Sequence, residues 1–247
     1  RRVLKLIRGY LTSGVLESGI VSPTDEGTPQ GGPLSPLLSN LLLDELDKEL
    51  ERRGHRFVLY ADDCNIYVRS VRAGERVMAG TKRFLERRLR LKVNEQKSAV
   101  GNASERKFLG YGFTKEAPPR RRISPQSLRR FKERVRRLTT RGRTLRLVVT
   151  ELTRYLRGWS GYYGRTEWPT QLRELDQWTR RRLRRYVWRQ WQRPKRRYRI
   201  LRRHGVPARQ AWRVVHFGPW RASLSQALSR VLPNAFFTSL GLHSLAG

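Results

Sequence analysis

The chain has 247 residues, of which 54 are Lys or Arg and 20 are Asp or Glu, so its formal net charge is +34. Such an excess of one sign makes a compact protein repel itself unless a polyanion lies against it, and nucleic acid is the polyanion that we expect. The single cysteine, Cys64, excludes a disulfide within the chain and a Cys-x-x-Cys zinc site. No apolar run of about 20 residues, the length that spans a bilayer, is present, so we expect no membrane partner.

Positive charge is concentrated in the second half of the chain. Residues 1–116 hold 21 Lys or Arg and 15 Asp or Glu, a net charge of +6, whereas residues 117–247 hold 33 and 5, a net charge of +28. The change falls at Ala117-Pro118-Pro119, which has the composition of a linker. The first half therefore has room for an acidic site, and the second half has the composition of a binding surface. The N-terminal RRVLKLIRGY lacks a cleavable apolar core, so we expect a cytoplasmic, bacterial-type intracellular protein.

The elements predicted in the first half alternate between helical and strand periodicity. Residues 2–12 have a helical pattern, and GTPQGGP at 27–33 forms a Gly/Pro loop. From 34 to 53 the leucines keep to one broad helical face, and Gly54 follows as a stop signal. Further along we expect strands at 57–61 and 65–69, a helix at 75–90 and a strand at 107–114. Helices mixed with antiparallel hairpins predict an α+β fold.

The second half is predicted to be mostly helical. Ser124-Pro125 combines an N-cap residue with Pro at the first helical position, and apolar residues at 128, 131, 135 and 138 then share one face. Helices are also expected over 144–158 and 170–192, with exposed faces made almost entirely of arginine.

Two adjacent carboxylates, Asp62 and Asp63, stand between the strand-like runs of FVLYADDCNIYVRS at 57–70. Side-by-side anions raise one another's pKa, and a bound divalent cation removes that cost. Magnesium prefers oxygen ligands and leaves room for water and phosphates, and a pair of such ions about 4 Å apart suits nucleotidyl transfer. The alternative is that Asp-Asp only forms a hairpin turn, where aspartate is common.

Several motifs in a fixed order extend this pattern over nearly the whole chain. They are EGTPQGGPLSPLLSNLLLDELD at 26–47, RFVLYADDCNIYVRS at 56–70, LKVNEQKS at 91–98, KFLGYGF at 107–113, RYLRGWSGYYG at 154–164, FGPWRAS at 217–223 and VLPNAFFTSLGLHSL at 231–245. Together they resemble the group II intron reverse transcriptase/maturase family. The resemblance implies a partial right-hand polymerase palm with an antiparallel sheet and helices, followed by an α-helical thumb, the maturase domain X. With one cysteine, we expect no C-terminal Cys/His endonuclease of the kind that some family members carry.

The resemblance also carries roles to matching positions. Asp62 and Asp63 would be two of three metal-binding carboxylates, and Lys97 would be a further catalytic residue, close to the triphosphate or its leaving group. The implied substrate-binding positions are Gln30, Gly31, Tyr60, Ala61 and Gly110, the last in the primer grip. Structural alternatives stand beside some of these roles, because Gly31 also permits a tight turn before a helix and Lys97 taken alone reads as a solvated lysine.

The family's third carboxylate lies in a strand upstream of the GTPQGGP block. Residues 1–25 contain only Glu17 and Asp25, neither in an apolar strand context, so we expect that carboxylate to be absent and the chain alone to be inactive as a polymerase. The expected domains are a partial reverse transcriptase palm at 1–116, a helical thumb or domain X at 117–192, and a basic C-terminal extension at 193–247, for which the resemblance implies DNA binding.

Arginines of the second half are candidates for RNA binding, since the guanidinium fork matches the geometry of phosphate. The candidates are Arg129, Arg130, Arg134, Arg137, Arg181, Arg182 and Arg185. Aromatic residues interleaved with the arginines either stack on unpaired bases or form the core of the thumb, and the core is the better expectation for any single tryptophan. These aromatic residues are Trp159, Tyr162, Tyr163, Trp188 and Trp191.

The sequence thus predicts an RNA-directed DNA polymerase and maturase that acts in splicing and mobility of a group II intron. Its cofactor would be Mg²⁺, and its partners intron RNA, a DNA primer or target, and deoxynucleoside triphosphates. One alternative is a non-polymerising, RNA-binding splicing cofactor that lacks the upstream catalytic aspartate. Another is a reverse transcriptase recruited to a different task, such as phage defence, against which the segments 154–164 and 217–245 argue.

Overall fold

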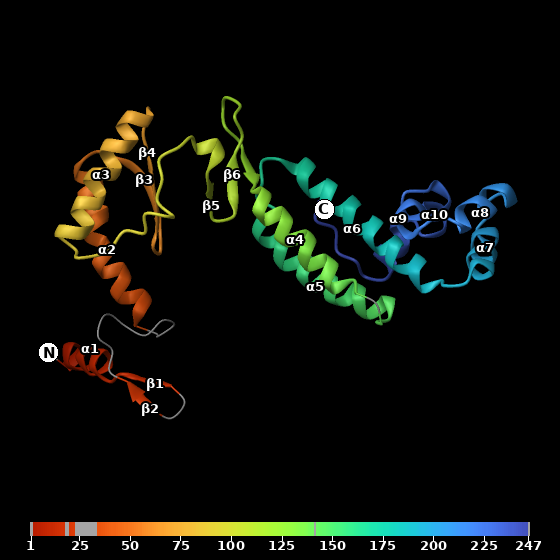
Figure 1. Ribbon diagram of the computed structural model, residues 1–247, viewed down its shortest axis with the longest axis horizontal. Helices are drawn as coiled ribbons and strands as arrows, with labels where there is room; N and C mark the ends of the chain where they lie inside the picture. The colour runs from red at the N-terminus through yellow and green to blue at the C-terminus, as the bar shows by residue number, and fades with distance from the viewer. Residues whose placement is uncertain (1, 18–19, 23–33, 141, 247) are drawn as a thin grey trace. The chain divides into compact units, whose positions relative to one another are not determined.

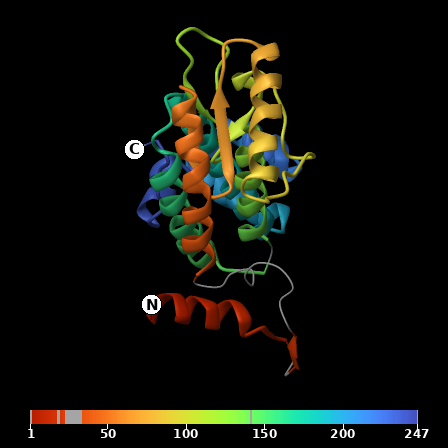
Figure 2. The same ribbon diagram turned by 90° about the vertical axis from the view of Figure 1, so that its left-hand side faces the viewer.

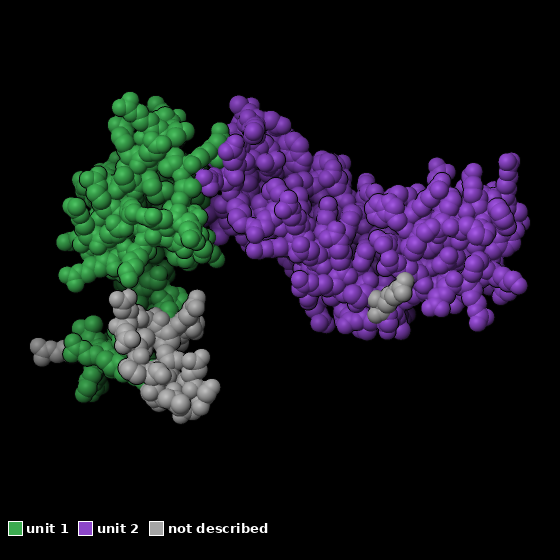
Figure 3. Space-filling view, viewed as in Figure 1, with its two compact units in different colours: residues 1–102 green, residues 103–247 purple. Residues whose placement is uncertain are grey.

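The computed structural model describes residues 2–17, 20–22, 34–140 and 142–246. The chain divides into two compact units, Arg1–Asn102 and Ala103–Gly247, which are treated separately below (Figure 3). Helices occur with small antiparallel sheets, which confirms the predicted α+β class. No helix in the described ranges is both long and apolar enough to cross a membrane.

The first unit is built on a helix–hairpin–helix arrangement. Helix α1 (Arg2–Thr12) and the antiparallel pair β1 (Val15–Glu17) and β2 (Ile20–Ser22) come first. Helix α2 (Ser35–Arg52), strands β3 (Arg56–Tyr60) and β4 (Asp63–Tyr67), and helix α3 (Val71–Arg87) follow. Figures 1 and 2 show α2 and α3 on one side of the β3–β4 hairpin. The helices predicted at 2–12 and 34–53 and the two predicted strands are confirmed, with ends that differ by one or two residues.

Local chain chemistry sets the ends of these helices. Gly54 has φ 69°; its N–H donates to the carbonyl of Glu51 at 2.8 Å, and the N–H of His55 donates to that of Leu50 at 3.0 Å. This pair of bonds is a Schellman motif, which confirms Gly54 as the stop signal of α2. Helix α3 begins four residues before its predicted start because the Ser70 hydroxyl accepts a bond from the N–H of Ala73 and caps the first turn.

The second unit joins a small sheet to a helical body. A short 3-10 turn, η1 (Ala103–Glu105), leads into the antiparallel sheet of β5 (Lys107–Phe108), β6 (Tyr111–Phe113) and β7 (Arg121–Ile123). The long helices α4 (Pro125–Leu138), α5 (Leu145–Tyr163) and α6 (Pro169–Gln190) lie next to one another (Figure 1). Shorter helices complete the unit: α7 (Pro194–Arg203), α8 (Ala208–Val215), α9 (Pro219–Ser223), α10 (Gln226–Val231) and α11 (Asn234–Ser239).

The core of the second unit lies between its three long helices. Ser124 caps α4 as predicted, and Phe131 and Val135 on its apolar stripe are fully buried. Phe131 packs on Trp159 of α5, with ring centroids 4.7 Å apart. The side chain of Gln171 on α6 joins β7 to this core, accepting from the N–H of Ile123 at 2.9 Å and donating to its carbonyl at 3.3 Å.

The C-terminal segment of the described chain, residues 232–246, folds back onto α5 and α6. Its apolar side chains Phe237 and Leu245 are buried in the same core as the long helices. The carboxylate of Asp176 on α6, itself 5% exposed, accepts bonds from the Ser244 hydroxyl at 2.6 Å and the Leu245 N–H at 3.0 Å. The Asp176 carboxylate therefore attaches the C-terminal segment to α6 by accepting hydrogen bonds from Ser244 and Leu245.

Candidate functional site

The β3–β4 hairpin places Asp62 and Asp63 at its turn. Tyr60 pairs with Asp63, so Ala61 and Asp62 are the two turn residues. Ala61 has φ 52°, the left-handed conformation that the first central position of a type II′ turn requires and that alanine rarely adopts. Both carboxylates are exposed. The prediction that two strands flank the acidic pair is confirmed, with Asp63 itself the first residue of β4.

The two faces of this hairpin differ in burial. Leu59 and Ile66 are half-buried, and β3 contacts α2. Tyr60 is 60% exposed and lies opposite Asp63 in the ladder, so these two side chains belong to the other face. The open face thus presents an aromatic ring beside a carboxylate.

The acidic pair fits a hard metal ion in the kind of ligand it offers, because Mg²⁺ prefers carboxylate oxygens. A two-metal centre needs more than two such groups. Within residues 2–17, 20–22, 34–140 and 142–246, no cluster of three or more His, Cys, Asp or Glu side chains is placed to hold a metal. The pair is therefore a partial ligand set there. The predicted positions Gln30 and Gly31 lie outside the described residues.

Lys97 lies in an exposed turn of the segment that follows α3. The backbone N–H of Lys97 donates to Oδ1 of Asn94 at 3.2 Å, so Asn94 organises the turn. An ion pair between Lys82 on α3 and Glu95 ties the same turn to the helix. Asn94 is thus a turn residue, while the catalytic role of Lys97 stays a prediction.

Cys64 directly follows the acidic pair, and its surroundings hold the thiol in the protonated form. Partial burial and the negative charge of Asp47 on α2 raise the pKa of the Cys64 thiol to about 11. Alkylation requires the thiolate, so at pH 8 we expect iodoacetamide to react with Cys64 about 100-fold more slowly than with a thiol of pKa near 9. The rate should keep rising about tenfold per pH unit until pH 11, and Asp47→Asn should accelerate it. A rate that levels off near pH 9 in the wild type would contradict this.

Gly110 lies in a tight turn packed against the long helices. The single strand expected over 107–114 is wrong, because Leu109 and Gly110 both have positive φ, 50° and 78°, and form a two-residue turn of type I′ character between β5 and β6. The Ser127 hydroxyl donates to the Gly110 carbonyl at 3.0 Å, and the Tyr162 hydroxyl donates to the Leu109 carbonyl at 2.8 Å. The turn therefore anchors the sheet to α4 and α5, a structural role that the sequence did not indicate.

Replacing Gly110 by Ala should destabilise the second unit by about 2 kcal/mol. A Cβ at this position would collide with the hydroxyl of Tyr163, and alanine disfavours a φ of 78°. Urea unfolding followed by tryptophan fluorescence reports on this unit alone, because all seven tryptophans lie at or after position 159. Gly158→Ala, at a helical position with no heavy atom within 4 Å of the new Cβ, is the matched control. Equal loss in both variants would count against the packing role of Gly110.

The predicted RNA-binding arginines lie on two helices of the second unit. The four on α4 are exposed and the three on α6 are half-buried. Trp159 and Trp188 are buried, so the expectation that a single tryptophan belongs to the core is confirmed for these two. The most exposed tryptophans are Trp212 on α8 and Trp220 on α9, which the sequence analysis did not single out although arginines flank both.

Two family models match the chain in succession. Residues 2–113 match the model described as reverse transcriptase (RNA-dependent DNA polymerase), and residues 128–205 match the maturase-specific domain of group II introns. The chain belongs to the group II intron reverse transcriptase/maturase family. In this family member the Asp62-Asp63 hairpin falls within the reverse transcriptase match, and the arginine-rich helices α4 and α6 fall within the maturase match.

Curated relatives of this chain are similar over short segments. The group II intron-encoded protein LtrA of Lactococcus lactis subsp. cremoris is 51% identical over 47 residues, which cover 19% of this chain and 8% of LtrA. Protein YkfC of Escherichia coli strain K12 is 40% identical over 52 residues, which cover 21% of this chain and 14% of YkfC. The matched segments are thus a small part of either relative.

Proposed function

We propose that the chain acts as palm and thumb of an RNA-directed DNA polymerase and maturase in the splicing and mobility of a group II intron. The observation that carries the proposal is the order of the two family matches, with an exposed Asp62-Asp63 hairpin inside the first. Asp62 and Asp63 would hold Mg²⁺, which when bound activates a primer 3′-hydroxyl and stabilises the leaving pyrophosphate. The partners would be intron RNA, a DNA primer or target, and deoxynucleoside triphosphates.

The remaining residues take their roles around this centre. Tyr60 and Ala61 would flank the primer end, Lys97 would approach the triphosphate, and Gly110 would belong to the primer grip. Gln30 and Gly31 would contact the incoming nucleotide and template. The domains of this proposal are a palm at 1–116, a thumb at 117–192 and a basic, DNA-binding extension at 193–247. Hydrogen bonds from Ser127 and Tyr162 to the β5–β6 turn also bring residues just before 116 into the thumb's compact unit.

A second candidate function is that of an RNA-binding splicing cofactor without polymerase activity. The partial ligand set around Asp62 and Asp63 in the described ranges favours it. The basic thumb would then provide the function, because arginine-rich surfaces bind the phosphate backbone without any metal centre.

Primer extension on an RNA template with Mg²⁺ and deoxynucleoside triphosphates, measured beside binding of group II intron RNA, tests which of the two activities the chain has on its own. We expect the chain alone to bind the RNA and to extend no primer, because the described residues place no third carboxylate with Asp62 and Asp63. Magnesium-dependent synthesis that is lost in the Asp62→Ala and Asp63→Ala variants would refute inactivity of the chain and establish the polymerase.

Metal binding at the acidic pair can be tested without activity. Mn²⁺ replaces Mg²⁺ at carboxylate sites and broadens nearby NMR signals, so the amides of residues 60–65 should broaden first. The Asp62→Asn, Asp63→Asn double variant should lose this effect, and the control Asp44→Asn on α2 should keep it. Uniform broadening over all exposed acidic residues would remove the metal role from the proposal.

A further inference from the structure

A pocket of about 370 Å³ lies in the second unit where the end of α4 meets α6, α7 and α9. Four arginines line it: Arg182, Arg185, Arg189 and Arg197. The other lining residues that the structure describes include Thr139, Tyr186, Gln190 and Gln192, and none of them is an acid. Its size lies at the lower end of the ~300–1,000 Å³ range of ligand pockets. Arg182 and Arg185 were predicted from the sequence as RNA-binding residues, whereas Arg189 and Arg197 were not.

Hydrogen bonds hold the side chains of two of the four arginines in the lining of the pocket. Arg182 donates from Nε to the hydroxyl of Thr139 at 2.8 Å. Arg197 donates from Nε to the carbonyl of Trp191 at 2.6 Å, and its guanidinium lies over the ring of Trp188, 4.7 Å from the centroid. Such bonds reduce the freedom of the long side chains, so a ligand that meets them loses little entropy on binding.

Arg185 presents a buried donor that the described protein leaves unused. Its Nε is shielded from solvent and has no hydrogen-bond partner among the described residues. A buried polar group without a partner costs folding free energy, and a charged one costs more. Arg185 also lines the pocket, so an anion there would stabilise its guanidinium charge and offset part of that cost.

Positive charge gathers around the pocket, because Arg182, Arg185 and Arg197 line it and none of its described lining residues is an acid. Burial lowers the pKa of Arg182, and repulsion from Arg185, Arg189 and Arg136 lowers it further. Asp176 on the same helix forms its ion pair with Arg180, and neither residue lines the pocket. Positive side chains held this close to one another attract an anion strongly.

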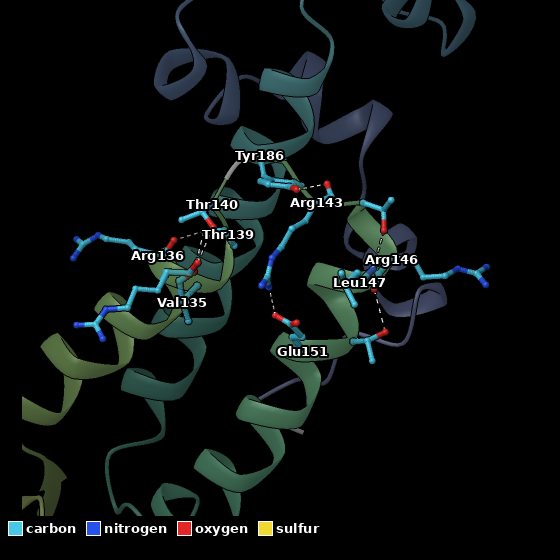
Figure 4. A network of polar contacts seen from close by, with 12 residues as sticks. Val135, Arg136, Thr139, Thr140, Arg143, Arg146, Leu147, Glu151 and Tyr186 are labelled. Atoms are coloured by element: carbon cyan, nitrogen blue, oxygen red, sulfur yellow. Dashed lines mark hydrogen bonds and ion pairs between the residues drawn. The ribbon is translucent and has the colours of Figure 1, made fainter.

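The rim of the pocket is held in place before any ligand arrives (Figure 4). Tyr186 and Gln190 on α6 donate to the carbonyl of Arg143 at 2.5 and 3.0 Å, and so fix the connection between α4 and α5. The guanidinium of Arg143 is paired with Glu151. Glu151 is thereby occupied and does not compensate the pocket arginines.

We propose that this pocket binds one phosphate group of the backbone of a folded RNA. The inference rests on the proposed RNA-binding function and adds to it a single fixed contact. The exposed arginines of α4 meet any backbone with similar energy, whereas a lined pocket accepts one phosphate in one orientation. Forked guanidinium donors suit phosphate oxygens better than a lysine ammonium does. The pocket would thus set the register of the thumb on its RNA.

The first arm of the test uses inorganic phosphate and the full chain. The Nε–Hε NMR signals of Arg185 and Arg182 should shift saturably with phosphate, and chloride at equal ionic strength should leave them in place. Arg185→Gln should abolish the saturable shift of Arg182. An Arg185 signal that follows ionic strength alone would overturn the pocket as an anion site, whatever the RNA does.

The second arm measures RNA affinity of Arg185→Gln against Arg130→Gln, a matched change on the exposed face of α4. We expect about tenfold weaker binding for Arg185→Gln and twofold or less for Arg130→Gln. Arg185→Lys, which keeps the charge and loses the fork, should fall between them, and thermal unfolding by circular dichroism checks that all three fold.

The outcomes distinguish failure of the pocket proposal from failure of the proposed RNA-binding function on which it rests. Equal losses in the Arg185→Gln and Arg130→Gln variants would overturn the pocket and leave RNA binding intact. Absence of RNA binding by the wild type would overturn the proposed function and the RNA assignment together. Saturable phosphate binding in that case would assign the pocket to a free phosphate or nucleotide instead of RNA.

Discussion

Raising the salt concentration from 50 to 200 mM should weaken binding of RNA to this chain by about 250- to 1,000-fold. Residues 117–247 carry a net charge of +28, and the arginines of α4 and α6 spread it over one helical body. Each phosphate contact releases a condensed counter-ion, so about six contacts give a slope of roughly −4 to −5 in a plot of log K against log salt. Fluorescence anisotropy with a labelled intron RNA at five salt concentrations measures this slope.

A charge-removal variant shows which residues produce the slope. Replacing the four exposed α4 arginines, Arg129, Arg130, Arg134 and Arg137, by Gln should reduce its magnitude by about 3. As a control, the same number of arginines can be replaced on α1 and α3 of the first unit, namely Arg2, Arg8, Arg72 and Arg76. Binding that does not change with salt, or an equal reduction in both variants, would show that the arginine face of α4 is not the RNA-binding surface.

Asp176→Ala should lower the free energy of unfolding of the second unit by about 3 kcal/mol. The carboxylate is buried and accepts from the Ser244 hydroxyl and from the N–H groups of Leu245 and Ala246. Without it these donors lose a charged acceptor, and the apolar side chains of the segment lose their attachment to α6. Urea unfolding followed by tryptophan fluorescence measures the change.

Glu174→Ala provides the control for this variant. Glu174 lies two residues earlier on the same helix and is exposed, so its removal should change stability by less than about 0.5 kcal/mol. Limited proteolysis adds a local measurement, since the segment after 232 should become cleavable in Asp176→Ala before the rest of the unit. A similar stability of the two variants would mean that the Asp176 bonds contribute little.

The parts of the fold that the sequence predicted well depend on short-range chemistry. At Gly54 helix α2 ends through two bonds, one from the Gly54 N–H to the carbonyl three residues before it and one from the His55 N–H to the carbonyl five residues before it. Ser124 caps α4 with its own side chain. The acidic pair was placed correctly between two strands because the apolar runs on either side have strand periodicity. In each case the decisive contacts lie within a few residues along the chain.

The features that the sequence did not predict depend on partners far away in the chain. The turn at Leu109 and Gly110 interrupts an apparently continuous strand because Tyr162 and Ser127 hold its carbonyls. The pocket arginines come from α6 and α7 and face Thr139 at the end of α4. A run of arginines looks the same in a sequence whether it covers an exposed face or encloses a cavity, so only the structure separates the two.

The attachment of residues 232–246 also bears on how the protein is made. The Thr153 hydroxyl on α5 donates to the carbonyl of Gly241, and the Asp176 carboxylate on α6 accepts from the N–H of Leu245. These partners lie 88 and 69 positions later in the chain, so both helices are synthesised before the segment that they bind. A nascent chain leaves the ribosome from its N-terminus at about 5–20 residues per second. The long helices would therefore emerge several seconds ahead of the segment that completes their core, with apolar surface uncovered in the meantime. Synthesis of this protein would thus include an interval in which a chaperone can protect the unfinished core of the second unit.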